Sequence, residues 1–269
     1  MTIAMPCALA IGGLDPGGGA GVVADLRAFA AAGAFGCAVV AVATVQSTDG
    51  MRRAWALPAR EVAEQAREVL RHQRVRAVKV GALGSAANVR AVAALLASRG
   101  ELAVVVDTPM LPSLGPARLL ARSAVQVLRE ALLPCATLVT VNSVEAEALL
   151  GEPVRTVGEA HDAARALVAD GGAHAALVKG GHLAGPMATD VLAVGGEVIE
   201  LRARRLPGVC VHGTGCTFAS LVAGRLATRP GRRVDRDVLV GAVRWAKRVH
   251  HAALARAVGV GGAARVLVF

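Results

Sequence analysis

The sequence predicts an α/β fold with a mostly parallel central sheet and helices on both faces. Short apolar runs alternate with segments of helical spacing, which is the pattern of repeated strand–helix units. Three of these runs, 8–12, 37–45 and 102–106, carry no charged residue, as expected for strands covered on both faces. Hydrophobic residues make up 54% of the chain, enough for a sizeable core. Because no linker rich in Pro or Ser divides it, we expect a single domain over residues 1–269.

The first hundred residues alternate strands with helices. We expect strands at 8–12, 37–45, 51–57 and 75–80, and helices at 22–32, 58–72 and 86–98. Residues 13–21 form a glycine-rich loop after the first strand, and Gly33 is typical of the residue that ends a helix. The strand at 51–57 is expected on a separate flap.

The rest of the chain continues the alternation. We expect strands at 102–106, 137–141, 175–178, 191–194 and 198–204, and helices near 116–133, over 143–150, after a capping box at 156–159, and after residues 215 and 236. Ligands of parallel sheets bind beyond the carboxyl ends of the strands. Asp107, Asn142 and Lys179 each fall at such an end, so we expect the functional site at that edge.

Charge and cysteine usage narrow the functional classes. The formal charge is +10, but arginines are scattered and aromatic residues make up only 2%, so we expect no nucleic-acid partner. Five widely spaced cysteines without a CxxC pair predict reduced thiols and a cytoplasmic protein. The uncharged run 28–48 contains Gly33 and Gly36 and ends in polar residues, so we expect a helix end and a strand rather than a membrane span.

The segment from Gly213 to Thr217 is the first candidate for chemistry. Gly213 and Gly215 allow close approach of the backbone to a ligand, and the helix that follows directs free amides at an anion such as a transferring phosphoryl group. Cys216 lies in the first helical turn, where the pKa of a thiol is usually lowered from about 8.5. Its thiolate would accept a proton from an alcohol. A tight glycine turn with a small buried cysteine is the alternative.

The loop from Gly13 to Gly21 is the second candidate. It lacks the Gly-Lys-Ser/Thr ending of a Walker loop, and Val22 breaks the Rossmann spacing. It either packs over a small ligand or is a flexible turn, with Asp25 an ordinary surface charge of the next helix.

Two further strand ends carry polar side chains. Asn142 and Glu145 have the spacing of a capping box, and the same side chains suit Mg²⁺ held through water. Lys179 precedes two glycines, which suits phosphate contact or a surface turn. His182 and His212 have no partner at zinc-binding spacing.

Taken together, these motifs resemble the hydroxymethylpyrimidine and phosphomethylpyrimidine kinases of thiamine biosynthesis, within the ribokinase-like superfamily. The resemblance covers residues 7–255 in collinear order. The matching segments are Gly13–Gly21, Ala24–Leu26, Gln46–Thr48, Lys79–Leu83, Asp107–Met110, Asn142–Glu145, Lys179–His182 and His212–Thr217.

The resemblance implies a ribokinase-like homodimer that uses ATP and Mg²⁺ to phosphorylate 4-amino-5-hydroxymethyl-2-methylpyrimidine, an aminopyrimidine alcohol, and then its monophosphate. It implies site residues in four groups. These are the anion hole Gly213, Gly215 and the base Cys216; the pyrimidine contacts Gln46, Asp25, Gly13, Ala82 and Pro109; the nucleotide contacts Lys179, Thr214 and Asp190; and the Mg²⁺ residues Asp107, Asn142 and Glu145.

Several positions depart from the family's pattern. Leu14 replaces Ser or Thr, Ala82 replaces Met, and Pro109 replaces Val beside the pyrimidine. The apolar stretch 209–211 replaces a polar one, and 258–269 stands where a Gly- and His-rich ending is usual. Two alternatives therefore stay open: a pyridoxal or pyridoxine kinase, which Ala82 and Pro109 would favour, and a catalytically degenerate homologue that binds a pyrimidine.

Overall fold

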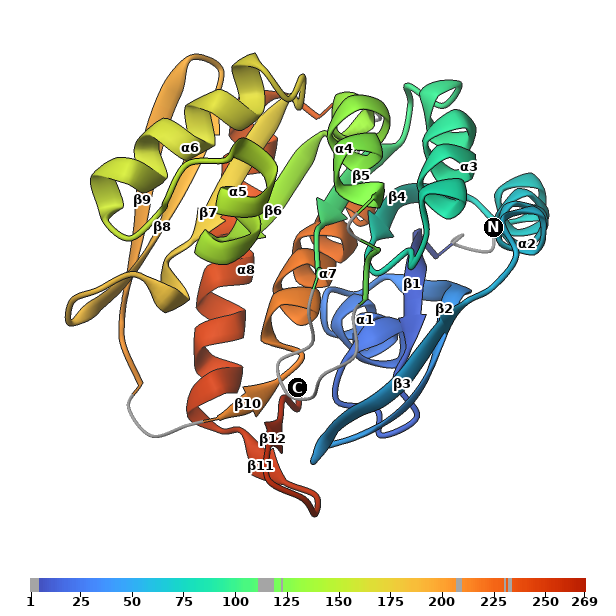
Figure 1. Ribbon diagram of the computed structural model, residues 1–269, viewed down its shortest axis with the longest axis horizontal. Coiled ribbons are helices and arrows are strands. Elements are labelled where there is room, and N and C mark those ends of the chain that lie inside the picture. The colour runs from blue at the N-terminus through green and yellow to red at the C-terminus, as the bar shows by residue number, and fades with distance from the viewer. Residues whose placement is uncertain (1–4, 111–118, 122, 207–209, 230, 232–233) are drawn as a thin grey trace.

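The computed structural model describes residues 5–110, 119–121, 123–206, 210–229, 231 and 234–269. Its centre is a nine-stranded sheet with the order β3-β2-β1-β4-β5-β6-β7-β8-β9 (Figure 1). The strands are β1 (Cys7–Leu14), β2 (Phe35–Ser47), β3 (Gly50–Ala56), β4 (Val75–Val80), β5 (Ala103–Asp107), β6 (Leu138–Asn142), β7 (Ala175–Lys179), β8 (Met187–Val194) and β9 (Glu197–Arg204). Strands from β2 to β7 in this order run parallel, whereas β3, β8 and β9 are antiparallel to their neighbours. The predicted α/β class with a mostly parallel sheet is confirmed.

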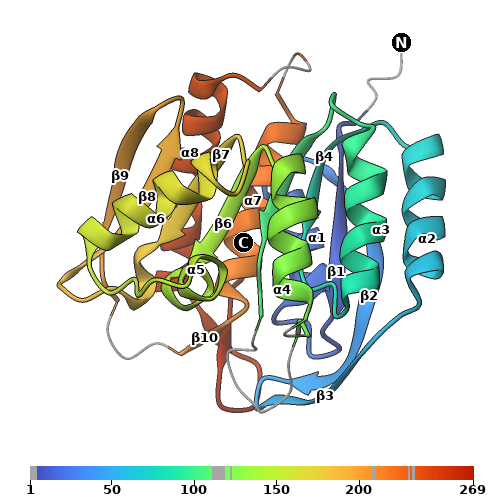
Figure 2. The same cartoon turned by 45° about the horizontal axis from the view of Figure 1, so that its top comes forward.

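Helices cover both faces of the sheet. One face carries α1 (Gly21–Ala31), α7 (Thr214–Ala227) and α8 (Arg236–Ala255). The other face carries α2 (Ala59–His72), α3 (Ala86–Ala97), α4 (Ala124–Val127), α5 (Ser143–Leu150) and α6 (Val157–Ala169), which Figure 2 shows side by side in front of the sheet. Among the described helices, none combines the length and apolar character needed to cross a bilayer.

Alternation along the strands divides the core between the two faces. On β1, Leu9 and Ile11 pack into the core under α2 and α3, while Ala8 and Ala10 pack against α1 and α7. The second core is built mainly from small side chains, so its helices lie close together. A Cβ atom added to Gly224 of α7 would lie 2.8 Å from the Cβ of Ala32. The small side chains therefore allow α7 to pack closely against α1.

The order of the strands reverses at β1, whose carboxyl end lies at the expected functional edge. From β1 the chain crosses to β2 on one side, and β4 then pairs with the other side of β1. At such a reversal the loops that leave two neighbouring strands go to opposite sides, and open α/β sheets bind ligands between these loops. The ends of β1 and β4 therefore mark one side of the expected site.

Some boundaries differ from the sequence prediction. The strand expected at 8–12 extends to Leu14, because β1 pairs with β2 through a bulge at Gly12 and Gly13. The helix expected near 116–133 is described from Ala124 and continues as a π-helical turn, Leu128–Leu132, and a 3₁₀ turn, Leu133–Cys135. Residues 111–118 and 122 lie outside the described part.

A small second sheet was not predicted. It has the order β10-β12-β11, from Val211–His212, Arg265–Val266 and Val258–Gly259. The Arg265 amide also donates to the Cys210 carbonyl at 3.0 Å, and Val211 packs against a cluster that contains Leu267. The packing of Val211 explains an apolar side chain at that position, whereas Cys210 takes part through its backbone and its side chain is exposed. Val209 lies outside the described residues.

Candidate active site

An ion pair joins the ends of β5 and β7. Lys179 Nζ donates to Asp107 Oδ1 at 2.8 Å and lies 3.9 Å from Glu145 Oε2. Lys179 keeps 16% of its side chain exposed, whereas Asp107 keeps only 2%. A Cβ atom added to Gly215 would lie 3.1 Å from Lys179 Nζ. The lack of a side chain at Gly215 thus brings the start of α7 directly onto the ion pair.

Asn142 and Glu145 form the predicted capping box at the start of α5. The Asn142 amide donates to Glu145 Oε2 at 2.8 Å, and the Glu145 amide donates to Asn142 Oδ1 at 2.9 Å. Burial raises the pKa of Glu145 to about 7, against the opposing effect of Lys179 and with a further rise from the Asp107 carboxylate. Part of the Glu145 population is therefore protonated near neutral pH, and an added cation would favour its carboxylate form.

Gly213 joins the anion-binding segment to the glycine loop. It has φ of +74°, and an added Cβ atom would lie 2.1 Å from the Gly19 carbonyl oxygen. On the other side, His250 Nε2 lies 3.0 Å from the Thr214 carbonyl oxygen. Burial lowers the pKa of His250 to about 4, so its ring is neutral at physiological pH and Nε2 carries the proton that it donates. Both contacts fix the backbone of the first turn of α7.

Cys216 lies in that turn, but its expected acidity is wrong for this structure. The side chain is partly exposed. Burial nevertheless raises the pKa of its thiol to about 12, because Lys79 and an amide hydrogen bond from Gly21 do not outweigh desolvation and the carboxylates of Asp107 and Asp25. Burial, with two nearby carboxylates, therefore outweighs the benefit that a helix N-terminus usually gives a thiolate.

Asp25 is buried, which excludes the alternative of an ordinary charge on the helix surface. It is fully buried, and its two carboxylate oxygens accept hydrogen bonds from Lys79 Nζ, both at 3.0 Å. Ser220 Oγ donates to Asp25 Oδ1 at 2.7 Å. Because Asp25 faces the interior between α1 and α7, it is not an ordinary surface charge, and its contact with the pyrimidine stays a prediction. It belongs to a charged layer beneath Cys216.

Asp190 is also engaged by the protein. Its Oδ1 accepts from the Gly180 amide at 2.8 Å, and its Oδ2 accepts from Lys247 Nζ at 2.7 Å. Only 5% of Asp190 is exposed. These contacts hold the backbone immediately after Lys179, and the nucleotide contact of Asp190 stays a prediction.

The predicted substrate side lies at the ends of β1, β2 and β4. A Cβ atom added to Gly13 would lie 3.6 Å from the Cβ of Ala82, so these two residues are neighbours. Gln46, near the end of β2, lies 2.9 Å from His212 Nε2. Pro109 follows β5, two residues beyond Asp107, and is half-buried.

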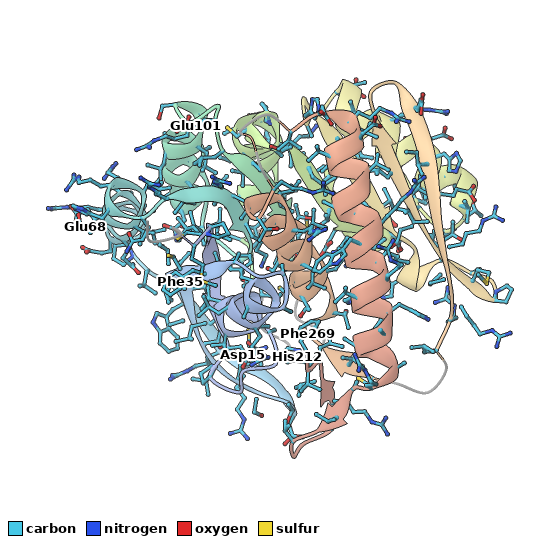
Figure 3. The ribbon with its side chains drawn as sticks, turned by 180° about the vertical axis from the view of Figure 1, so that it is seen from behind. Asp15, Phe35, Glu68, Glu101, His212 and Phe269 are labelled. Atoms are coloured by element: carbon cyan, nitrogen blue, oxygen red, sulfur yellow. The ribbon has the colours of Figure 1, made fainter. Side chains whose placement is uncertain are left out.

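Sequence reasoning missed the polar residues that support these groups. Asp15 Oδ2 lies 3.0 Å from His212 Nε2, a pairing that Figure 3 shows between the glycine loop and the start of α7. Lys79 lies in one of the matching motifs, and a lysine near the end of a buried strand was a usable signal. Ser220 and His250 had no such signal, because both are ordinary residues of helical segments.

Known proteins resemble this chain over most of its length. The profile of the phosphomethylpyrimidine kinase family matches residues 15–267. The chain is 45% identical to the hydroxymethylpyrimidine/phosphomethylpyrimidine kinase of Streptomyces coelicolor over 222 residues, 82% of this chain and 81% of that protein. It is 39% identical to the enzyme of the same name from Escherichia coli over 239 residues, 88% of each chain.

Solved structures show the same fold. A pyridoxal kinase from Bacillus subtilis, in complex with ADP, is 26% identical, with a TM-score of 0.85 over 98% of this chain and 97% of that one. The phosphomethylpyrimidine kinase of Clostridium difficile is 28% identical, with a TM-score of 0.77 over 93% of this chain and 99% of that one. The ribokinase-like architecture predicted from the motifs is therefore confirmed.

Proposed function

Because the chain belongs to the phosphomethylpyrimidine kinase family, we propose that it transfers the γ-phosphoryl group of ATP to 4-amino-5-hydroxymethyl-2-methylpyrimidine and then to the monophosphate formed. The observation that carries this proposal is the approach of Gly215, at the start of α7, to the Lys179–Asp107 ion pair. Phosphoryl transfer mainly requires positioning and stabilisation of negative charge, and both are available at this point.

The anion hole consists of the backbone at Gly213 and Gly215, aided by the N-terminal end of α7. Lys179 and Thr214 contact the nucleotide phosphates, since both lie at the same end of the sheet. ATP as the donor is supported by the ADP complex of the similar pyridoxal kinase. Asp190 acts on this side indirectly, through Gly180 and Lys247.

Mg²⁺ suits the carboxylates beside Lys179. Asp107, Asn142 and Glu145 supply the hard oxygen donors that Mg²⁺ prefers, and the raised pKa of Glu145 indicates a buried carboxylate that a cation would stabilise. Since the capping box and Lys179 already engage these side chains, they would hold the ion partly through water. When bound, Mg²⁺ supplies charge neutralisation at the transferring phosphate.

Cys216 takes the proton of the acceptor alcohol. The substrate oxygen forms the bond to the γ-phosphorus, the bond from phosphorus to the β-phosphate bridging oxygen breaks, and the hydroxyl proton passes to the Cys216 thiolate. Because the pKa of the thiol is high, only a small fraction of the protein molecules carries the Cys216 thiolate at neutral pH, but that thiolate is a strong base. In a loose transition state the acceptor alcohol loses its proton late, so a small thiolate fraction is sufficient for the reaction.

The ring contacts are proposed for Gln46, Gly13, Ala82 and Pro109. Gln46 can both donate and accept, as an aminopyrimidine edge requires. Pyridoxal is the second candidate acceptor, because it also carries a hydroxymethyl group and the similar Bacillus subtilis protein is a pyridoxal kinase. The test is incubation with ATP and Mg²⁺ and each alcohol in turn. Tight binding of the pyrimidine without ATP consumption would favour a degenerate homologue instead.

We place the protein in the cytoplasm as a homodimer. All five cysteines are free, which suits a reducing compartment. The edge strand β3 exposes half of Trp55 beside Arg53, the kind of surface through which a second copy could pair with the sheet.

A further inference from the structure

The Gln46 amide lies between two polar neighbours. Its Nε2 position is 2.9 Å from His212 Nε2, and its Oε1 position is 3.2 Å from Thr44 Oγ1. Thr44 Oγ1 is also 2.8 Å from the Leu14 carbonyl oxygen, and His212 Nε2 is 3.0 Å from Asp15 Oδ2. Asp15, Thr44 and His212 are each less than 10% exposed, so water does not compete freely for these contacts.

Counting protons fixes one end of the amide. A hydroxyl group has a single proton. The shorter contact of Thr44 is to the Leu14 carbonyl, which can only accept, so the Thr44 proton is used there. Thr44 Oγ1 must then accept from Gln46, which requires the amide nitrogen, not the oxygen, on the Thr44 side.

The end of the Gln46 amide that faces His212 leads to the same orientation. Asp15 accepts hydrogen bonds from the Gly17 amide at 2.8 Å and the Ala20 amide at 2.9 Å. Although burial opposes it, these bonds and His212 lower the pKa of Asp15, so it is a carboxylate. A carboxylate facing His212 Nε2 requires a proton on that nitrogen. His212 Nε2 then has no lone pair to offer Gln46, so the amide group facing it must be the oxygen, which shares the single Nε2 proton with Asp15.

We propose that His212, held by Asp15, locks the Gln46 amide with its oxygen toward His212 and its nitrogen toward Thr44, and that this lock selects the ring. Amide oxygen and nitrogen are assigned from hydrogen bonding. Exchange of the two atoms removes the donor–donor contact with His212 and the acceptor–acceptor contact with Thr44. His212 is a positioning residue, since it acts through Gln46. The selection of a ring rests on the proposed function.

The lock has a chemical consequence. Gln46 keeps one N–H and one oxygen lone pair for a ligand. A 4-aminopyrimidine edge offers a ring-nitrogen acceptor beside an amino donor, while the 4-oxo ring offers the reverse order. A freely rotating amide could serve both rings by turning over, whereas a locked amide serves only one. Rejection of the wrong ring then follows from unpaired polar groups.

The glycine loop is shaped around this lock. A Cβ atom added to Gly19 would lie 2.4 Å from His212 Cδ2 and 3.1 Å from Val266 Cγ1. His212 is therefore confined between the glycine loop and β12, so that its ring cannot turn away from Asp15. This confinement gives the loop a role in ring selection in addition to packing over a small ligand.

The first test reads the proton directly. Nitrogen-15 NMR of the imidazole of His212 in the free, full-length protein should show a proton on Nε2. An Nε2 without a proton would make His212 an acceptor and would overturn the lock. This measurement does not depend on catalysis.

The second test measures ring selectivity. The ratio of kcat/KM for the 4-amino pyrimidine alcohol to that for its 4-oxo analogue should fall about tenfold in His212→Met, the scale of one lost hydrogen bond. The ratio should stay within about threefold in His212→Gln, which keeps a donor near the Nε2 position. Thr44→Val and Thr44→Ser form a second pair with the same expected contrast. His161→Met, which breaks the remote His161–Glu200 pair, is the control.

The outcomes separate the two proposals. A purely structural role for His212 would reduce turnover of both rings equally, and an unchanged ratio in His212→Met and Thr44→Val would overturn the inference. If the unsubstituted protein phosphorylates neither ring, the proposed function fails, while the protonation of His212 still decides whether the amide is locked.

Discussion

Lys79 Nζ lies 3.0 Å from both carboxylate oxygens of Asp25, and the two side chains are 1% and 0% exposed. Burial alone would lower the pKa of Lys79, but Asp25, Cys216 and Asp107 raise it above its usual value, so the lysine stays charged. Lys79 thus places a fixed positive charge beneath Cys216, and the Asp25 carboxylate neutralises that charge.

Removing one partner of this pair should destabilise the fold strongly. Lys79→Met leaves a buried carboxylate unpaired, and we expect a loss of about 3–5 kcal/mol in the free energy of unfolding. Asp25→Asn should also be costly, whereas the double variant should lose much less than the sum. Urea unfolding of the four proteins measures this coupling. Additive losses would mean that the two charges do not depend on each other.

The acidity of Cys216 predicts a pH profile. The pKa of the Cys216 thiol in the ligand-free protein is about 12, so its thiolate fraction rises about tenfold per pH unit over the neutral and mildly alkaline range. If the thiolate accepts the proton, kcat/KM should rise with the same slope, since this parameter reports on the free enzyme. Cys216→Ser should cut turnover about 10²–10⁴-fold while substrate binding persists. A flat profile with unchanged Cys216→Ser turnover would leave catalysis to the anion-hole amides alone.

Glu145 should make stability depend on pH and Mg²⁺. Its folded pKa, about 7, lies above the reference value of 4.5, so the folded state binds the proton more tightly than the unfolded state. This group therefore favours folding at low pH, and the free energy of unfolding falls by up to about 3 kcal/mol as pH rises through 4.5 to 7. A bound cation favours the carboxylate, so Mg²⁺ should raise Tm more at about pH 8 than at about pH 5.5.

Glu145→Gln provides the matched variant, because glutamine also completes a capping box. It should lose both the pH dependence and the alkaline response to Mg²⁺ without loss of the helix cap. An equal Mg²⁺ effect in this variant would remove Glu145 from the metal site.

The backbone at Gly213 should tolerate no side chain. Gly213→Ala forces a Cβ to within 2.1 Å of the Gly19 carbonyl at a positive φ, so we expect lower thermal stability and loss of turnover. Gly100→Ala is the control, since an added Cβ has nothing within 4 Å and the residue has no positive φ. Similar effects of the two substitutions in melting and kinetic assays would contradict a specific contact between Gly213 and the glycine loop.

The strands of the main sheet could be predicted from the sequence because a strand is recognised from the pattern of neighbouring residues. Apolar strands ending in Asp107, Asn142 and Lys179 fix both the layer pattern and the edge where polar groups meet. Pairing between distant segments was not accessible in this way. The contact of Val211 with Arg265 in the second sheet depends on how the chain ends fold back, which periodicity does not encode.

The same distinction applies to the site. The capping role of Glu145 follows from a three-residue spacing, but the burial of Asp25 depends on α7 lying over α1. The thiol of Cys216 was misjudged for a related reason: the helix end is local, while Asp25 and Asp107 approach from other elements. The rarity of lysine was the neglected signal, because Lys79, Lys179 and Lys247 each pair with an aspartate at or near this edge.

A competition assay tests the central claim most directly. The protein is supplied with ATP, Mg²⁺ and an equimolar mixture of 4-amino-5-hydroxymethyl-2-methylpyrimidine and pyridoxal, and the phosphorylated products are separated and quantified over time. We expect the pyrimidine monophosphate to form first and then the diphosphate, with pyridoxal phosphate a minor product. Phosphorylation of pyridoxal in preference to the pyrimidine would contradict the assignment.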